Sequence, residues 1–325
     1  MQTGQTVSLG GMEVPALGVG AWAWGTKNSW GYGREYGRED VAAAFGASLE
    51  DGVTVVDTAE VYGNGASERI IGELLRERRS GSGNAGPAGP VLATKFAPLP
   101  YRVQARSLLK ALDGSLARLG VEGVDLYQIH FPSPVMRVEP LMDALAEAVK
   151  EGKARQVGVS NYGASAMNRA HDRLARHGVR LASNQVHYSL LNRDPETNGV
   201  LEACRDLGVT LIAYSPLAQG LLTGKYAPGD GENRPAGMVR RFGKSFSEKN
   251  LQKIQPVVEI LREIGAAHER EPSQVALNWL VGRQGVLPIP GAKNERQARQ
   301  NAGALGWDMT PGERERLDLA TLGWR

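Results

Sequence analysis

Four residues with titratable side chains follow or end short apolar runs of the sequence. They are Asp57, Tyr62, Lys95 and His130. If these runs are neighbouring strands of one parallel barrel, their carboxyl ends meet at one face, where ligands bind. The sequence therefore predicts that the four side chains converge there.

A phenol, an ammonium, a carboxylate and an imidazole can together deliver a proton to a carbonyl oxygen. A free tyrosine, with a pKa of about 10, is a poor proton donor at neutral pH. The Lys95 ammonium would stabilise the Tyr62 phenolate, and the Asp57 carboxylate could hold that ammonium in place. His130 could donate a hydrogen bond to the oxygen on which negative charge develops.

Each of the four residues also has a structural interpretation. Lys95 and Asp57 could be a buried ion pair, Tyr62 a packing aromatic and His130 a core histidine with satisfied hydrogen bonds. Four such coincidences at one face are far rarer than one, so we prefer the chemical interpretation.

Eight apolar runs, each long enough for a buried strand, alternate with segments of helical period. Several of the helical segments end at a glycine, as helix C-caps do. Continuous apolar strands covered by helices indicate a parallel sheet, and their number favours a closed (β/α)8 barrel over an open doubly wound sheet. The runs are LGVGAWAW (17–24), TVVDTA (54–59), VLATKFA (91–97), VDLYQIH (124–130), ARQVGVSN (154–161), ASNQVHY (182–188), TLIAYSPL (210–217) and GVLPIPG (285–291).

We expect one α/β barrel domain over residues 1–325, with extended loops on its C-terminal face. A β-hairpin that turns at Gly10 and Gly11 precedes the barrel. The segment 80–90 contains few large apolar residues and is interpreted as a surface loop. The long polar segment 218–246 follows the seventh strand and is a candidate lid over a ligand.

Composition excludes several function classes. The net charge of +3 is spread along the chain, so no nucleic-acid partner is expected, and no apolar stretch is long enough to cross a membrane. No Cys/His cluster predicts a metal site. The single Cys204 and the lack of a signal peptide indicate a reducing compartment, the cytoplasm or, after removal of a transit peptide, an organelle stroma.

Seven motifs, in order along almost the whole chain, resemble the signatures of the aldo-keto reductases. The resemblance is stronger to bacterial and plant-chloroplast members of the branch that also contains potassium-channel β subunits. It implies a (β/α)8 barrel, in agreement with the strand pattern. The motifs are GVTVVDTAEVYG (52–63), VLATKF (91–96), VDLYQIHFP (124–132), VGVSNY (157–162), NQVHYSLL (184–191), LIAYSPLAQGLLTGKY (211–226) and PIPGAKN (288–294).

The resemblance gives each of the four titratable residues a role. It implies that Tyr62 is the general acid, that Lys95 and Asp57 lower its pKa, and that His130 orients the carbonyl of a small-molecule substrate. No metal takes part in this chemistry.

The resemblance also implies an extended NADPH across the mouth of the barrel. Ser160, Asn161 and Gln185 match positions that bind the carboxamide, and amide side chains suit a group that both donates and accepts. Tyr214 would stack on the nicotinamide ring.

Two further segments match cofactor contacts of the family. One is the loop over the pyrophosphate; barrel packing is the alternative interpretation of two of its residues, Ser215 and Leu217. The other binds the adenosine and its 2′-phosphate; pairing of Lys293 with that phosphate favours NADPH over NADH. The matching residues are Ser215, Leu217, Gly220 and Lys225 on the loop, and Gly291, Lys293, Gln297 and Asn301 on the later segment.

The substrate wall is less well defined by sequence. Phe131 follows His130 at a position where many relatives have tryptophan, so the pocket is expected to differ in width or to lose an indole donor. Trp24, Trp30, Phe131 and Tyr162 are candidates for an apolar wall, with packing at the barrel rim as the alternative for each.

Two functions of different classes follow from the resemblance. The first is an NADPH-dependent reductase of aldehydes or ketones, with Tyr62 as the proton donor. The second is a cofactor-binding regulatory subunit of the channel-β type with little turnover, because one fold can serve both. The sequence leaves the carbonyl substrate and the oligomeric state open.

Overall fold

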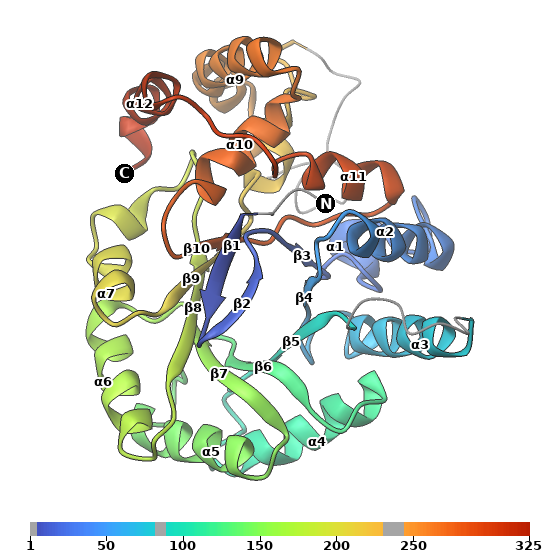
Figure 1. Cartoon of the computed structure of the whole chain (residues 1–325), viewed down its shortest axis with the longest axis vertical. Helices are drawn as coiled ribbons and strands as arrows, with labels where there is room; N and C mark the ends of the chain where they lie inside the picture. Colours follow the sequence, from blue (N-terminus) through green and yellow to red (C-terminus); the bar gives the residue numbers. More distant parts are fainter. Residues whose placement is uncertain (1–4, 82–88, 230–243) are drawn as a thin grey trace.

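The computed structural model describes residues 5–81, 89–229 and 244–325. Within these residues, a parallel sheet of eight strands lies at the centre and helices surround it (Figure 1). Each predicted run overlaps one strand. The strands are β3 (Gly18–Gly20), β4 (Val55–Asp57), β5 (Val91–Phe96), β6 (Val124–Ile129), β7 (Ala154–Ser160), β8 (Leu181–His187), β9 (Thr210–Tyr214) and β10 (Val286–Pro288).

The strands follow one another around the sheet in chain order, from β3 to β10. The two ends of the sheet meet at Gly20 and Gly291, which form a parallel bridge, and Gly20 N–H donates to Pro290 O at 2.9 Å. The predicted (β/α)8 barrel is therefore confirmed, with a short seam between β10 and β3.

The N-terminal hairpin covers the amino-terminal end of the barrel. Its strands, β1 (Thr6–Leu9) and β2 (Met12–Pro15), pair antiparallel around the predicted turn. Leu9, fully buried, packs with barrel residues such as Leu126 and Ile212. Side chains on the opposite, carboxyl-terminal face of the barrel are therefore the ones available to a ligand.

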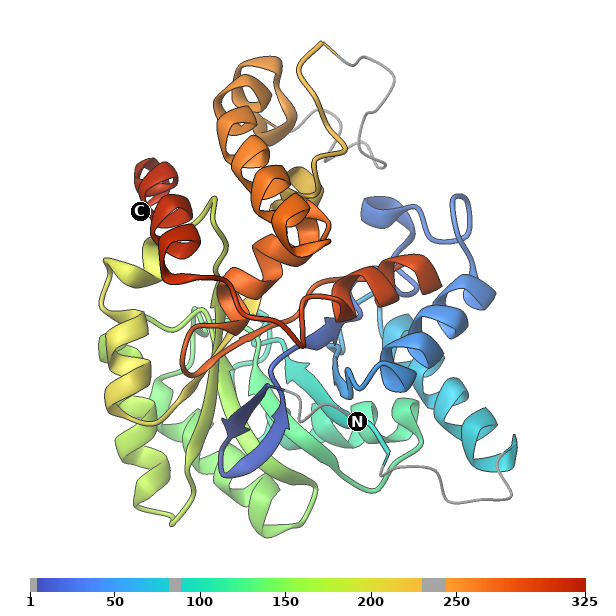
Figure 2. The same ribbon diagram turned by 45° about the horizontal axis from the view of Figure 1, so that its top comes forward.

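The helices bury apolar stripes against the outside of the barrel, and α9 and α10 rise from one side of it (Figure 2). The glycines predicted as helix ends, Gly52, Gly120, Gly152, Gly178 and Gly208, all have positive φ. The helices are α1 (Lys27–Trp30), α2 (Arg38–Glu50), α3 (Ala66–Gly81), α4 (Ser107–Leu119), α5 (Val138–Lys150), α6 (Ala164–Ala175), α7 (Val200–Asp206), α9 (Glu248–His268), α10 (Pro272–Val281), α11 (Glu295–Ala302) and α12 (Pro311–Ala320), with 3-10 turns η1 (Asp194–Glu196), η2 (Ala218–Thr223), η3 (Lys244–Phe246) and η4 (Leu322–Trp324).

Four predicted strands are much shorter than expected: those in the runs 17–24, 54–59, 210–217 and 285–291. The run 17–24 is a strand only over β3, because the chain turns at Ala21, whose carbonyl accepts from Trp24 N–H at 3.0 Å. The run 210–217 ends at Tyr214, because Ser215 has a φ of 50°. Most of the expected surface loop 80–90 and the middle of the candidate lid 218–246 lie outside the described residues. Among the helices of the described part of the chain, none has the length and apolarity of a membrane span.

Candidate active site

A cavity of about 1020 Å³ lies at the carboxyl ends of the barrel strands. Its lining includes Gly20, Asp57, Ser160 and Tyr214, which are the last residues of β3, β4, β7 and β9. Tyr62 and His130 line the same cavity, whereas Lys95 is fully buried behind it. Every residue expected to contact the cofactor also lines it: Ser160, Asn161, Gln185, Tyr214, Ser215, Leu217, Gly220, Lys225, Gly291, Lys293, Gln297 and Asn301.

Lys95 connects Asp57 to Tyr62. Its Nζ makes a short ion pair with Asp57 Oδ1 and donates to the Thr58 carbonyl at 2.8 Å. The third contact of Nζ is with the Tyr62 hydroxyl, at 3.3 Å. Burial acts to lower the pKa of Lys95, but the Asp57 and Tyr62 contacts outweigh it and raise that pKa, so the side chain is a cation at neutral pH.

Two glutamines complete the surroundings of the Asp57 carboxylate. Its Oδ2 accepts from Gln185 Nε2 at 2.9 Å and from Gln128 Nε2 at 3.3 Å. Our sequence analysis missed Gln128, although it precedes His130 by two residues on β6 and so faces the same side of the sheet. Three donors hold the buried Asp57 charge, which fixes the position of Lys95.

The Tyr62 hydroxyl is protonated at neutral pH. Burial raises its pKa above the ordinary value, while the Lys95 charge acts to lower the pKa and the Asp57 charge to raise it. The expectation that both Lys95 and Asp57 lower this pKa is therefore wrong in sign for Asp57. A carboxylate disfavours a second negative charge nearby, so Asp57 acts on Tyr62 only by keeping Lys95 charged and in place.

His130 is a neutral hydrogen-bond donor. Burial, with a smaller effect of the Lys95 charge, lowers its pKa to about 3. Its Nδ1 is buried and has no hydrogen-bond partner among the described residues. A proton on that atom would cost about 1–3 kcal/mol as an unsatisfied donor. Nε2 is therefore the ring nitrogen available to donate to a ligand in the cavity, and the His130 ring lies beside the Tyr62 ring, with 5.6 Å between their centroids.

The carboxamide-binding residues predicted on β7 and β8 form one connected cluster. Asn161 has a φ of 60° and is held by hydrogen bonds from its Nδ2 to the His130 carbonyl at 3.2 Å and to Ser160 Oγ at 3.0 Å. Its Oδ1 accepts from the Tyr214 hydroxyl at 3.1 Å, and Ser160 Oγ donates to the Gln185 carbonyl at 2.8 Å. A strained residue kept by this many contacts is typical of a binding site.

Tyr214 is supported from behind by a histidine. The His187 ring lies parallel to the Tyr214 ring, with a centroid distance of 5.4 Å and an interplanar angle of 8°. Asn192 makes a hydrogen bond to His187 Nδ1 and so fixes the rotation of that ring. The ring predicted to stack on the nicotinamide thus has a rigid support.

The chain after β9 bends sharply across the cavity. Ser215, Ala218 and Gln219 have φ values of 50°, 47° and 58°, in the left-handed region that few non-glycine residues adopt. Such strain needs a compensating structure around it. Leu217 and Gly220, predicted to lie over the pyrophosphate, belong to the same bend.

The predicted adenosine-binding residues lie between β10 and α11 and on that helix. Lys293 N–H donates to Gln297 Oε1 at 2.9 Å, and Asn301 Nδ2 donates to the Gly291 carbonyl at 3.2 Å. Lys293 Nζ donates to the Trp30 carbonyl at 2.7 Å. An ammonium, two amides and a helix N-terminus therefore gather at one end of the cavity.

Comparison with known proteins places this geometry in a family. The model of the Aldo/keto reductase family matches residues 16–320. The chain belongs to the aldo/keto reductase family. Membership confirms the resemblance drawn from the motifs and makes the protein an oxidoreductase of the NAD(P)-dependent kind.

Individual members of the aldo/keto reductase family align with almost the whole chain. Pyridoxal reductase, chloroplastic, of Arabidopsis thaliana is 36% identical, over 97% of this chain and 86% of the relative. An uncharacterized oxidoreductase of Mycobacterium tuberculosis is 37% identical, over 96% and 91%. The crystal structure of an aldo-keto reductase from Klebsiella pneumoniae in complex with NADPH superposes with a TM-score of 0.74 at 28% identity, covering 98% of this chain and 95% of that one.

Two residues expected in the substrate wall of this aldo/keto reductase are core residues instead. Trp24 is fully buried: its Nε1 donates to the Ala292 carbonyl at 2.7 Å and its ring packs edge-on against Phe45. Tyr162 is 1% exposed, and its own carbonyl accepts from Asn184 Nδ2 at 2.8 Å. Neither side chain lines the cavity, so both expectations are wrong.

The other two candidates, Trp30 and Phe131, do line the cavity, together with a tryptophan that we did not predict. Trp22 is 43% exposed and lies over the Tyr62 ring at 6.1 Å between centroids, with the Trp30 ring edge-on to it at 5.3 Å. The sequence AWAW offers two tryptophans, and only the turn after β3 decides that Trp22 faces the cavity and Trp24 the core.

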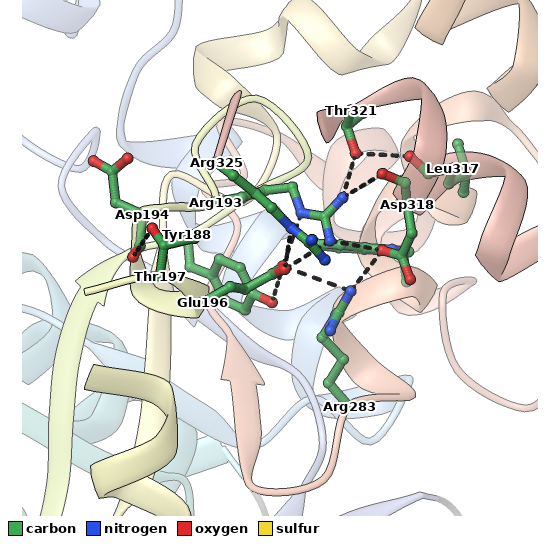
Figure 3. A network of polar contacts seen from close by, with 11 residues as sticks. Tyr188, Arg193, Asp194, Glu196, Thr197, Arg283, Leu317, Asp318, Thr321 and Arg325 are labelled. Atoms are coloured by element: carbon green, nitrogen blue, oxygen red, sulfur yellow. Dashed lines mark hydrogen bonds and ion pairs between the residues drawn. The ribbon is translucent and has the colours of Figure 1, made fainter. Parts of the chain in front are cut away.

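A buried charge network stabilises the loop that follows β8 (Figure 3). Arg193 is fully buried, and its guanidinium pairs with Glu196 at 2.7 Å and with Asp318 at 3.0 Å. Asp318 also pairs with Arg283 at 2.7 Å, and the Tyr188 hydroxyl donates to Glu196 at 2.8 Å. The network fastens α12 to the same loop that carries Asn192 and, through it, His187. Further contacts to it come from Thr321 and Arg325.

Proposed function

We propose that the protein reduces aldehydes or ketones to alcohols with NADPH, using Tyr62 as the general acid. One observation carries the proposal: the Tyr62 hydroxyl lines the cavity at 3.3 Å from the buried Lys95 ammonium. A phenol beside a fixed cation can release a proton to a ligand, because the phenolate that remains is stabilised at once.

The cavity fits an extended nicotinamide dinucleotide. Ser160, Asn161 and Gln185 offer donors and acceptors for the carboxamide, and Tyr214 offers a flat apolar face for the ring. Lys293 offers a cation for a 2′-phosphate, which supports NADPH over NADH. When bound, the reduced nicotinamide supplies the hydride that the carbonyl carbon receives.

The residues of this chain supply the proton and stabilise the charge. His130, neutral because of its lowered pKa of about 3, donates its Nε2–H to the carbonyl oxygen and orients it. Tyr62 then gives its hydroxyl proton to that oxygen as negative charge develops on it. Lys95 stabilises the phenolate that remains, and Asp57 holds Lys95.

The substrate side of the cavity favours a planar, aromatic carbonyl compound. Trp22, Trp30 and Phe131 surround the approach to Tyr62 and His130, and aromatic faces stack well on planar rings. The Arabidopsis relative is named a pyridoxal reductase, and pyridoxal is an aromatic aldehyde. Pyridoxal is therefore the first substrate that we propose.

The proposal is tested by the oxidation of NADPH in steady state. The purified protein is mixed with NADPH and a panel of carbonyls: pyridoxal, a benzaldehyde, a short aliphatic aldehyde, a sugar aldehyde and a ketone. We expect turnover with the aromatic aldehydes to exceed that with the aliphatic and sugar aldehydes by at least about tenfold in kcat/KM. Tight binding of NADPH without oxidation by any carbonyl would contradict the proposal and favour the regulatory-subunit alternative.

A further inference from the structure

Lys293 already has an acidic partner inside the cavity. Its Nζ lies 3.6 Å from Glu35 Oε2, and the same atom donates to the Trp30 carbonyl at 2.7 Å. The Lys293 side chain is 18% exposed and that of Glu35 is 45% exposed. Glu35 and Lys293 both line the cavity, so the carboxylate lies beside the residue expected to bind the 2′-phosphate.

Glu35 lies in a turn whose backbone is held by several hydrogen bonds. Gly31 has a φ of 80° and caps α1, and a Cβ atom at this position would lie 2.7 Å from Glu35 Cδ. The backbone N–H of Glu35 donates to the Gly31 carbonyl at 3.0 Å, and Gly33 N–H donates to the Tyr36 carbonyl at 2.8 Å. Tyr36 anchors the end of the turn, because its buried hydroxyl donates to the Ala23 carbonyl at 2.6 Å.

A carboxylate at this place distinguishes the two dinucleotides. A 2′-phosphate that binds Lys293 carries about two negative charges and would lie beside the Glu35 carboxylate, so the two anions compete for one ammonium. A 2′-hydroxyl has the opposite preference, because it can donate a hydrogen bond to a carboxylate, as NAD ribose does in other folds. Glu35 therefore opposes NADPH and favours NADH.

We propose that Glu35 is a specificity-determining residue that limits the preference for NADPH over NADH by competing with the 2′-phosphate for Lys293. The inference rests on the proposed function, since it assumes that the cavity binds a nicotinamide dinucleotide. In this arrangement Lys293 recognises a phosphate at the 2′ position of the adenosine ribose, and Glu35 recognises a hydroxyl there.

The test is the pair of dissociation constants for NADPH and NADH, measured by isothermal titration calorimetry at one ionic strength. We expect Glu35→Gln to tighten NADPH and weaken NADH, so that the ratio of the two Kd values shifts toward NADPH by about tenfold. Lys293→Met should shift the ratio in the opposite direction. Titrations with 2′,5′-ADP and 5′-ADP repeat the comparison on fragments that lack the nicotinamide.

The matched control is Glu39→Gln, which removes the same charge from an exposed residue of α2 outside the cavity lining. Thermal melting by circular dichroism checks that each variant is folded. The inference is overturned if Glu35→Gln and Glu39→Gln change the ratio equally while the wild-type protein binds dinucleotides. If the wild-type protein binds neither NADPH nor NADH, the proposed function itself fails.

Discussion

Burial and neighbouring charges set the protonation states of Tyr62, Lys95 and His130 at the proposed reaction centre. It raises the pKa of Tyr62, so the phenol still holds its proton at neutral pH, and it lowers the pKa of His130 to about 3, so the imidazole is uncharged. Lys95 stays charged only because Asp57 and Tyr62 outweigh its burial. One cation, one anion and two neutral donors are thus fixed before any ligand binds.

The buried neutral His130 predicts a loss of stability in acid. Its folded-state pKa of about 3 lies below the ordinary value of 6.5, so protons bind the unfolded chain first as the pH falls below 6.5. Because of this residue, the free energy of unfolding should be about 2 kcal/mol lower at pH 5 than at pH 7. His130→Asn should remove that part of the loss, as measured by urea denaturation at both pH values.

The matched control for this measurement is His171→Asn on α6, where the histidine is only partly buried. It should leave the wild-type pH dependence in place. Equal pH dependence in the wild-type protein and His130→Asn would show that His130 is not buried as a neutral ring.

At the scale of elements, the loop after β8 links the active site to the C-terminal helix. His187 supports Tyr214, Asn192 fixes His187, and the Arg193 network begins at the next residue. Arg193 N–H also donates to the Trp324 carbonyl at 2.7 Å. The ring proposed to stack on the nicotinamide therefore depends on the docking of α12, although no residue of α12 lines the cavity.

Glu196→Gln should weaken this docking. Glu196 is 8% exposed and accepts hydrogen bonds from Arg193 and Tyr188, so its loss leaves buried guanidinium groups with Asp318 as their main counter-charge. Breaking a buried pair costs about 3–5 kcal/mol. We expect a lower midpoint in thermal unfolding and a weaker affinity for NADPH.

The contribution of Glu196 to the free energy of unfolding should depend on pH. Burial acts to raise the pKa of Glu196, but Arg193 and Tyr188 outweigh it and lower that pKa below 4.5. The stabilisation is therefore complete above pH 4.5 and is lost as the pH falls further, so the wild-type protein and Glu196→Gln should converge in acid. Glu202→Gln, at an exposed site on α7, should match the wild-type protein throughout. A Glu196→Gln protein as stable as Glu202→Gln at pH 7 would contradict the role of the network.

Local sequence predicted the elements well and their ends less well. Apolar runs and C-cap glycines located the strands and helices, because buried strands and helix ends have local signatures. The turn after β3 has no such signature, so we placed Trp24 in the pocket and missed Trp22. The contact between Glu35 and Lys293, which are far apart in sequence, depends on a loop conformation that no local pattern indicates.

At the scale of the whole molecule, barrel closure brings the site together. The hydrogen bond of Gly20 to Pro290 joins the first and last strands, and it places the turn with Trp22 beside the loop with Lys293. The count of strands predicted this closure. The net rise in the pKa of Tyr62 could not be predicted, because its largest cause is a depth of burial that only the closed barrel defines.

The central claim is that Tyr62 donates the proton, and its replacement by phenylalanine tests this directly. Tyr62→Phe removes one hydroxyl, so the rate of carbonyl reduction should fall by about 10³-fold while the Kd for NADPH changes by less than about twofold. Tyr101→Phe, which removes a hydroxyl from a residue that is 74% exposed, should keep full activity. A Tyr62→Phe protein that reduces carbonyls as fast as Tyr101→Phe would contradict the claim.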